Sequence, residues 1–133
     1  MSHPTTFDDI ARRALERLGP EPANWVPDRP GVDANVVIVG AGHSGLSLAF
    51  ALRRAGVGKV IVVEAAEEGR ESIWRERARM RTLRTPKTSL GPDLGIPDLS
   101  FQAWFEHRYG AEAFAALGRP ATSDWADYVD WYR

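Results

Sequence analysis

The sequence predicts an α/β fold, and the evidence is a pair of β-branched runs with a helical segment between them. The runs are Asn35–Val39 and Lys59–Glu64, and the intervening residues have the composition of a buried helix. A strand, a helix and a second strand within about 30 residues are typical of a parallel βαβ unit. Further helices are expected before and after this unit.

An amphipathic helix and a proline-rich linker should precede the βαβ unit. Apolar residues recur at helical spacing behind Thr6, which is placed as the N-cap, and Gly19-Pro20 would end the helix. Prolines recur in the next stretch and disfavour both helix and strand. We therefore expect the helix and linker in residues 1–30 and the main domain in residues 31–133.

The βαβ unit itself is expected to be well covered. The strand Asn35–Val39 should be buried on both faces because it is rich in β-branched residues. The helix is expected from about Ser44 to Ala55, and its few polar residues mean that it too must be covered. Gly56 or Gly58 would provide its exit.

Loops and short helices should make up the rest of the chain. Most of the region from Ala66 to Ser100 is expected to be loop, because it is basic at first and then rich in turn residues. Two short helices should follow, the first capped by Ser100, with Gly110 and Gly118 as their stops. A last helix is expected behind a Ser123 cap. Its apolar stripe comprises Trp125, Tyr128, Val129 and Tyr132.

Composition excludes several classes of function. The chain has 133 residues, 17 basic and 18 acidic residues, and no cysteine. Balanced charge gives no reason to expect nucleic acid or a membrane as a partner. The lack of cysteine rules out disulfides and thiol nucleophiles and fits a cytoplasmic protein. No signal sequence or membrane span is expected, and the histidines are too isolated to predict a metal site.

A glycine turn follows the first strand in the pattern Gly40-x-Gly42-x-x-Gly45. The first glycine allows a sharp turn, the second lets a pyrophosphate approach the backbone, and the third lets helix and strand pack closely. The helix N-terminus then offers N–H groups and a positive dipole end to phosphates, and Ser44 adds a hydroxyl. Together with Ala41, these residues form the predicted phosphate site of a Rossmann-like unit.

Glu64 ends the second strand about 20 residues beyond Gly45, where a carboxylate can accept hydrogen bonds from the hydroxyls of an adenosine ribose. The same carboxylate would repel a 2′-phosphate. The site should therefore hold the ADP half of FAD or NAD rather than that of NADP. The alternative is a plain βαβ unit with a glycine turn, whereas a phosphate loop is excluded because no Gly-Lys-Ser/Thr follows.

The stretch from Val36 to Ala66 resembles the FAD-binding N-terminus of flavoproteins with two dinucleotide-binding domains. The next segments, "EEGRESIW" with Trp74 and "RMRTLRTPK", are similar to those of flavin-containing, Baeyer–Villiger and N-hydroxylating monooxygenases. The resemblance implies that NAD(P)H reduces bound FAD and that one oxygen atom passes from O₂ to a small-molecule substrate. It also implies that Trp74, Met80 and Thr85 lie on the flavin side. For Trp74 the alternative is a core anchor.

Basic residues are concentrated after the second strand. They could contact flavin phosphates or a reduced nicotinamide nucleotide, form a nucleic-acid patch, or be a solvated charged face. Seven of them lie close together in sequence: Arg70, Arg75, Arg77, Arg79, Arg81, Arg84 and Lys87.

Two strands are too few for a complete dinucleotide-binding sheet. A second glycine fingerprint and a substrate domain are also missing from the sequence. We therefore expect an incomplete, truncated domain, the N-terminal portion of a longer flavoprotein, which binds FAD weakly and is inactive alone. The alternatives are a fragment of an NAD-dependent dehydrogenase and a non-catalytic nucleotide-binding module completed by a partner chain.

Overall fold

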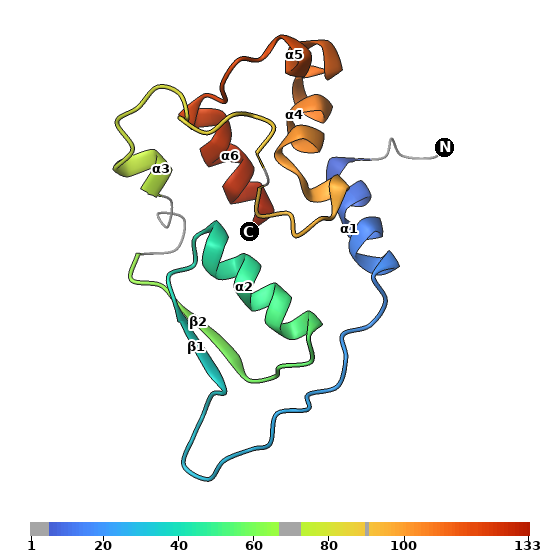
Figure 1. The fold of residues 1–133 in the computed structure, drawn as a ribbon, viewed down its shortest axis with the longest axis vertical. Coiled ribbons are helices and arrows are strands. Elements are labelled where there is room, and N and C mark those ends of the chain that lie inside the picture. Colours follow the sequence, from blue (N-terminus) through green and yellow to red (C-terminus); the bar gives the residue numbers. More distant parts are fainter. Residues whose placement is uncertain (1–5, 67–72, 90) are drawn as a thin grey trace. The chain divides into compact units, whose positions relative to one another are not determined.

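The computed structural model describes residues 6–66, 73–89 and 91–133 (Figure 1). The chain forms two compact units. The first, here called the helical unit, comprises Met1–Gly19 and Ile73–Tyr132, and the second, the βαβ unit, comprises Pro20–Ser72 with Arg133. Each unit has its own elements and is described by itself.

The βαβ unit contains the strand–helix–strand order that the sequence predicts. β1 (Val36–Val39) pairs in parallel with β2 (Val60–Val63), with Val36 opposite Val60 and Val39 opposite Val63. The backbone continues the pairing at both ends, from Asn35 N to Lys59 O at 2.9 Å and from Gly40 N to Val63 O at 2.7 Å. The prediction of a parallel βαβ unit is confirmed.

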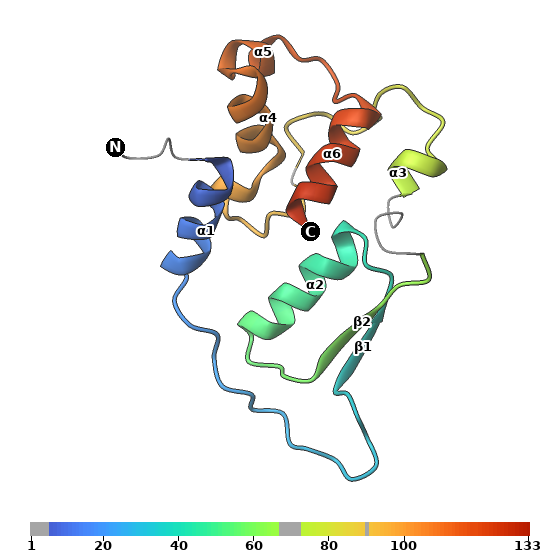
Figure 2. The ribbon, with the colours of Figure 1, turned by 180° about the vertical axis from the view of Figure 1, so that it is seen from behind.

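The connecting helix α2 (His43–Arg54) lies along one face of the strand pair, as Figure 2 shows from behind. Its end forms a Schellman motif, in which Gly56 adopts a φ of 75°. The N–H of Gly56 donates to Arg53 O at 3.0 Å, and that of Val57 donates to Leu52 O at 2.9 Å. Of the two predicted exits, the helix therefore uses Gly56.

The other face of the strand pair is open in the part of the chain that the structure describes. Ile38 points to the covered side and is buried, but four other strand side chains are 41% to 87% exposed. These are Val37, Val39, Ile61 and Val63. The prediction that the first strand is buried on both faces is wrong for this structure. Burial of both faces needs a layer on each side, and in the βαβ unit the described helix covers one.

The proline-rich linker has no helix or strand, as predicted, but it is bound closely to the βαβ unit. The guanidinium of Arg53 donates to Glu21 Oε2 from Nε at 3.1 Å and from Nη2 at 3.0 Å. The side chain of Asn24 accepts from Gly58 N at 2.8 Å, and the indole N–H of Trp25 donates to the carbonyl that ends α2. Contacts group these residues with the strands, whereas the sequence suggested a boundary after residue 30.

The helical unit begins with α1 (Phe7–Arg17) and continues after residue 72. Thr6 caps α1 as predicted, in a capping box with Asp9. The later elements are α3 (Ile73–Glu76), η1 (Pro97–Leu99), α4 (Phe101–Tyr109), α5 (Ala111–Ala116) and α6 (Thr122–Tyr132). They enclose an aromatic core cluster that consists of Phe101, Trp104, Phe105, Phe114, Tyr128 and Val129.

Two helix ends of this unit follow the sequence, and two do not. α5 ends at Ala116, because Leu117 is already extended, so Gly118 is not its stop. Ser100 caps α4 by accepting from Ala103 N at 3.1 Å, and Gly110 ends α4, as predicted. The predicted Ser123 cap is wrong, because α6 already begins at Thr122. The N–H of Thr122 donates to Arg81 O at 3.0 Å, so a distant segment fixes the start of this helix. Among the described residues, no helix is long and apolar enough to cross a membrane.

Candidate nucleotide-binding site

The turn between β1 and α2 is built around Gly40. This glycine has a φ of 104°, a conformation that side chains disfavour, and its N–H still bonds to the end of β2. Gly42 then serves as the N-cap of α2 with an extended backbone. The chain thus passes from strand to helix in three residues, as the fingerprint predicts.

Gly42 and Gly45 have different surroundings. A Cβ on Gly45 would lie 2.0 Å from the carbonyl oxygen of Gly40 and 3.3 Å from a methyl group of Ile38. A Cβ on Gly42 would have nothing within 4 Å. Gly45 is therefore required for packing within the turn, whereas Gly42 leaves open space beside the backbone where a phosphate group can approach.

The start of α2 suits an anion. The backbone N–H groups of Ser44 and Gly45 have no hydrogen-bond partner among the residues that the structure describes, and the first turn contains no acid. The helix dipole places partial positive charge at this end. Free donors, open space at Gly42 and a positive helix end together fit the diphosphate of a dinucleotide.

Glu64 reaches from the end of β2 to the glycine turn. Its Oε2 accepts from Ala41 N at 2.8 Å, and its Oε1 accepts from Ala65 N at 2.8 Å and from Ala66 N at 3.1 Å. These backbone donors, with Ala41 contributing most, lower the pKa of the carboxyl group, so Glu64 is ionised. A carboxylate offers about four acceptor positions, which leaves capacity for a ribose hydroxyl.

The sequence profile of a family described as FAD-NAD(P)-binding matches residues 37–133. The chain belongs to this family. Over 122 residues, which are 90% of the chain, it is 46% identical to a protein named FAD-dependent urate hydroxylase from Xanthomonas campestris pv. campestris. The chain spans 26% of the length of that relative. No solved structure matches this chain.

Family membership confirms the resemblance to FAD-binding flavoproteins drawn from the sequence. FAD is the cofactor that the family description and the name of the relative have in common. The glycine turn and Glu64 lie within the matched residues and are brought together in the βαβ unit. The predicted turn residues and the acid at the strand end thus form one arrangement within a member of this family.

His43 lies within the glycine pattern, between Gly42 and Gly45. It is the first residue of α2, and its side chain is half-buried. Burial lowers the pKa of its imidazole, which keeps the ring neutral near pH 7. No sequence signal separates such a histidine from an exposed one, because its burial depends on packing. In the described part of the chain, no cluster of histidine and acidic residues could hold a metal ion.

The three predicted flavin-side residues all lie in the helical unit. Trp74 packs against the aromatic core cluster and meets Trp125 edge to face, with ring centroids 6.2 Å apart. This environment is that of the core anchor named as its alternative role. Met80 is 43% exposed, and Thr85 is also exposed. A flavin-side role for Trp74, Met80 and Thr85 stays a prediction.

The structure also reveals a charge cluster that the sequence did not suggest. The guanidinium of Arg75 bonds to Asp127 at 2.7 Å and to Asp130 at 2.6 Å, and Arg108 lies 3.6 Å from Asp127. These bonds hold α3 against α6 and raise the pKa of Arg75, chiefly through Asp127. Sequence reasoning missed the cluster because Arg75 lies 52 and 55 residues before Asp127 and Asp130 and meets them only in the folded unit.

Proposed function

We propose that the chain is the FAD-binding part of an FAD- and NAD(P)H-dependent oxidoreductase, a monooxygenase in the whole protein. The hydrogen bond between Glu64 and the N–H of Ala41 is the observation that carries this proposal, because it brings the ribose-binding acid beside the phosphate-binding turn. FAD, when bound, would carry electrons from NAD(P)H to oxygen. The protein supplies binding and orientation.

Each part of the turn has a role in holding the dinucleotide. Gly40 and Gly42 give the backbone its path and its open space, and the N–H groups of Ser44 and Gly45 donate to the diphosphate. Glu64 accepts from a ribose hydroxyl. The contact that Glu64 makes with Ala41 also fixes the turn before any ligand arrives, which reduces the ordering cost of binding.

Similarity to a named hydroxylase supports the monooxygenase class. The identity of 46% covers nine-tenths of this chain but about a quarter of the relative. The region compared is the part that holds the cofactor, so it supports FAD and hydroxylation more strongly than any one substrate. The substrate is therefore left as a small molecule.

The open strand face supports a further part of the proposal. The sheet that carries the nucleotide site has two strands and four exposed apolar side chains. A sheet of this size is marginally stable by itself. We expect the 133-residue chain alone to bind FAD weakly and to show no turnover. Tight stoichiometric FAD on the purified chain would contradict this expectation.

The test is a titration of the purified chain with FAD and, separately, with NAD. Flavin fluorescence and thermal shift report binding, and Gly42→Val fills the open space at the turn. We expect FAD to change the flavin fluorescence and the melting temperature with the wild-type chain, and we expect Gly42→Val to abolish both changes. A response to NAD with none to FAD would instead favour the dehydrogenase alternative, because Glu64 suits the ribose of either nucleotide.

The second candidate is a nucleotide-binding module completed by a partner chain. The exposed face formed by Val37, Val39, Ile61 and Val63 is the observation that favours it. Size-exclusion at several concentrations, with a dye that binds apolar surface, tests this candidate. A monomer at every concentration that binds no dye would exclude it.

A further inference from the structure

The helical unit contains a pocket of about 430 Å³ to which the start of α1, the end of α4 and the end of α6 all contribute. Its walls include Phe7, Asp8, Trp104, His107, Arg108 and Trp131. Pockets that hold small ligands usually have volumes of about 300 to 1,000 Å³. The pocket is therefore large enough for a small molecule, and one unit supplies all of its walls.

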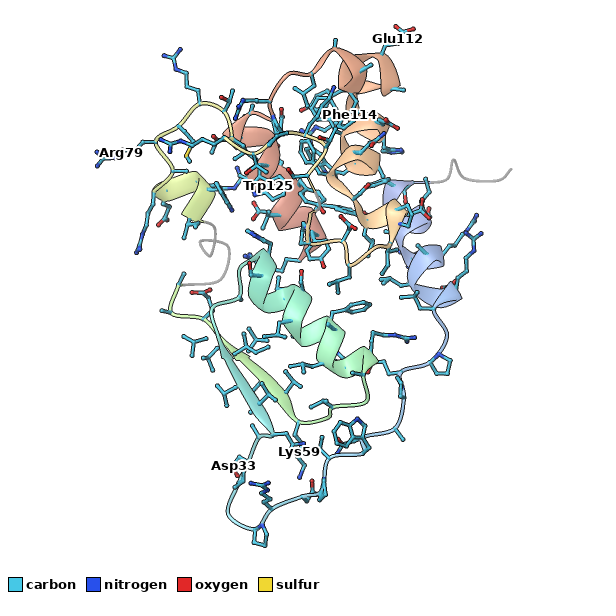
Figure 3. The ribbon with its side chains drawn as sticks, viewed as in Figure 1. Asp33, Lys59, Arg79, Glu112, Phe114 and Trp125 are labelled. Carbon is cyan, nitrogen blue, oxygen red and sulfur yellow. The ribbon has the colours of Figure 1, made fainter. Side chains whose placement is uncertain are left out.

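Aromatic rings form the apolar wall of this pocket. Phe7 stacks on His107 with ring centroids 4.9 Å apart and lies against Trp131 at 4.6 Å. Phe7 and Trp131 are half-buried, so part of each ring stays accessible. By contrast, Phe114 and Trp125, which Figure 3 labels, lie among the helices of the unit and belong to its core or pack against it. The pocket thus offers flat apolar surface that the core does not use.

Two nitrogen-bearing side chains in the last turn of α4 stand beside these rings. His107 is exposed, and its imidazole makes no hydrogen bond or ion pair with the residues that the structure describes. Arg108 is also exposed, and its guanidinium lies 3.6 Å from a carboxylate oxygen of Asp127. A guanidinium has more N–H donors than such a pair uses. Both side chains can therefore donate to a ligand in the pocket.

The remaining charges of the pocket favour an anion over a cation. The one acid in its wall, Asp8, already accepts from the indole N–H of Trp131 at 2.8 Å. An organic cation is held by aromatic faces that are open to it. Here the guanidinium of Arg108 lies over the ring of Trp104, 5.4 Å from its centroid, and Phe7 contacts two other rings. The protein's own cation thus takes the place that a bound cation would need.

We propose that this pocket binds a small planar aromatic anion, whose ring lies against Phe7 and Trp131 and whose charge is bound by Arg108 and His107. Hydrogen bonds from a guanidinium to a carboxylate are charge-assisted, and the fork can form two in parallel. Ring contacts add apolar burial and favour offset or edge-to-face geometry. The inference goes beyond the proposed function, because the glycine turn and Glu64 belong to the βαβ unit and take no part in it.

The test is a titration of the full chain with benzoate, which combines a flat ring with one carboxylate. Calorimetry measures the affinity. The NMR signal of the Trp131 indole N–H reports the location, because this group bonds to Asp8 in the wall of the pocket. Benzamide has the same ring without the charge. We expect benzoate to shift the Trp131 signal and to bind about tenfold more tightly than benzamide.

Matched variants assign the charge to α4. Arg108→Gln should weaken benzoate binding about tenfold and leave benzamide binding unchanged, whereas unfolding of the pocket would weaken both probes. His107→Gln should weaken benzoate binding less than Arg108→Gln does, because the bond that it removes lacks the guanidinium fork. Arg13→Gln, at an exposed arginine of α1 outside the pocket, should change the benzoate affinity less than about twofold.

Three results would overturn the inference. One is the absence of both heat and a shift of the Trp131 signal with benzoate at millimolar concentration. Another is equal weakening of benzoate binding by Arg108→Gln and Arg13→Gln, which would indicate a net-charge effect. The third is tighter binding of benzylamine than of benzoate, which would make the pocket a cation site. Benzoate binding by a chain that does not bind FAD would support the inference and contradict only the proposed function.

Discussion

The carboxylate of Glu64 accepts a hydrogen bond from the backbone N–H of Ala41, with 2.8 Å between Oε2 and N. The two residues come from the end of the second strand and from the glycine turn after the first. The contact therefore joins the two halves of the candidate dinucleotide site. It also holds the pKa of Glu64 below its ordinary value and keeps the group charged.

Glu64→Gln should weaken FAD binding. The amide offers a single acceptor oxygen and no charge, so it cannot keep the three backbone hydrogen bonds and also accept from a ribose hydroxyl. We expect a loss of about tenfold in affinity, measured by flavin fluorescence quenching. Glu112→Gln, at an exposed glutamate on α5, is the matched control and should leave the affinity unchanged. If Glu64→Gln binds FAD as tightly as wild type does, Glu64 does not contact the cofactor.

The two glycines of the turn should respond differently to alanine. Gly45→Ala places a Cβ about 2 Å from the carbonyl of Gly40, so the turn must shift, and we expect a loss of at least about 2 kcal/mol in the free energy of unfolding. Gly42→Ala meets open space and should cost less than about 1 kcal/mol. Denaturant unfolding measures both values.

FAD titration of the same two variants separates folding from binding. Gly42→Ala should fold normally and bind FAD more weakly, because the new methyl group lies where the phosphate approaches. If Gly42→Ala binds as wild type does, the open space at this glycine is not the phosphate position.

Tyr128→Phe should destabilise the helical unit. Tyr128 has no exposed surface, and its hydroxyl donates to Leu99 O at 2.8 Å. Burial raises the pKa of this phenol, so it stays a neutral donor. Removal leaves a buried carbonyl without that donor and should cost about 1–2 kcal/mol by denaturant unfolding. Tyr109→Phe is the comparison, because that hydroxyl bonds to Asp124 from a half-exposed ring; it should cost less than about 0.5 kcal/mol.

The N-terminal cap of α1 should make stability depend on pH below 4. Hydrogen bonds from the backbone N–H and the hydroxyl of Thr6, and from Arg12, lower the pKa of Asp9 to about 2. A lowered folded-state pKa gives stability that is complete above the unfolded pKa, near 4, and is lost as the pH falls toward 2.

Thermal melting between pH 5 and pH 2 tests this prediction of the cap. In Asp9→Asn the fall in melting temperature over this range should be shallower than in wild type. Glu16→Gln, on the same helix outside the cap, should retain the wild-type slope. An unchanged slope in Asp9→Asn would mean that the capping box contributes nothing to the pH dependence of stability.

Local sequence patterns predicted the helices, the strand pair and the glycine turn. The N-caps at Thr6 and Ser100 are confirmed because each depends on a side chain bonding to an N–H within three residues. The glycine fingerprint is equally local. The acid at the end of β2 was found by its distance from the turn, which a βαβ unit holds nearly constant.

Predictions that depend on distant contacts were less accurate. The strand expected to be buried on both faces has Val37 and Val39 exposed, because burial is set by the layers that pack on a sheet. α6 begins two residues earlier than the predicted Ser123 cap implies, because Thr122 bonds to Arg81. Nothing in the sequence near Ser123 carries that information.

The sequence by itself determined the βαβ unit, the glycine turn and the acid at the end of the second strand, because these follow from backbone preferences and fixed short spacings. Tertiary structure alone decided that Glu64 bonds to Ala41, that Trp74 joins an aromatic core, and that Arg75 bonds to Asp127 and Asp130. Each of these outcomes depends on which remote segment supplies a donor, an acceptor or an apolar surface. Such partners are chosen by the packing of the whole unit and leave no periodic signal in the sequence.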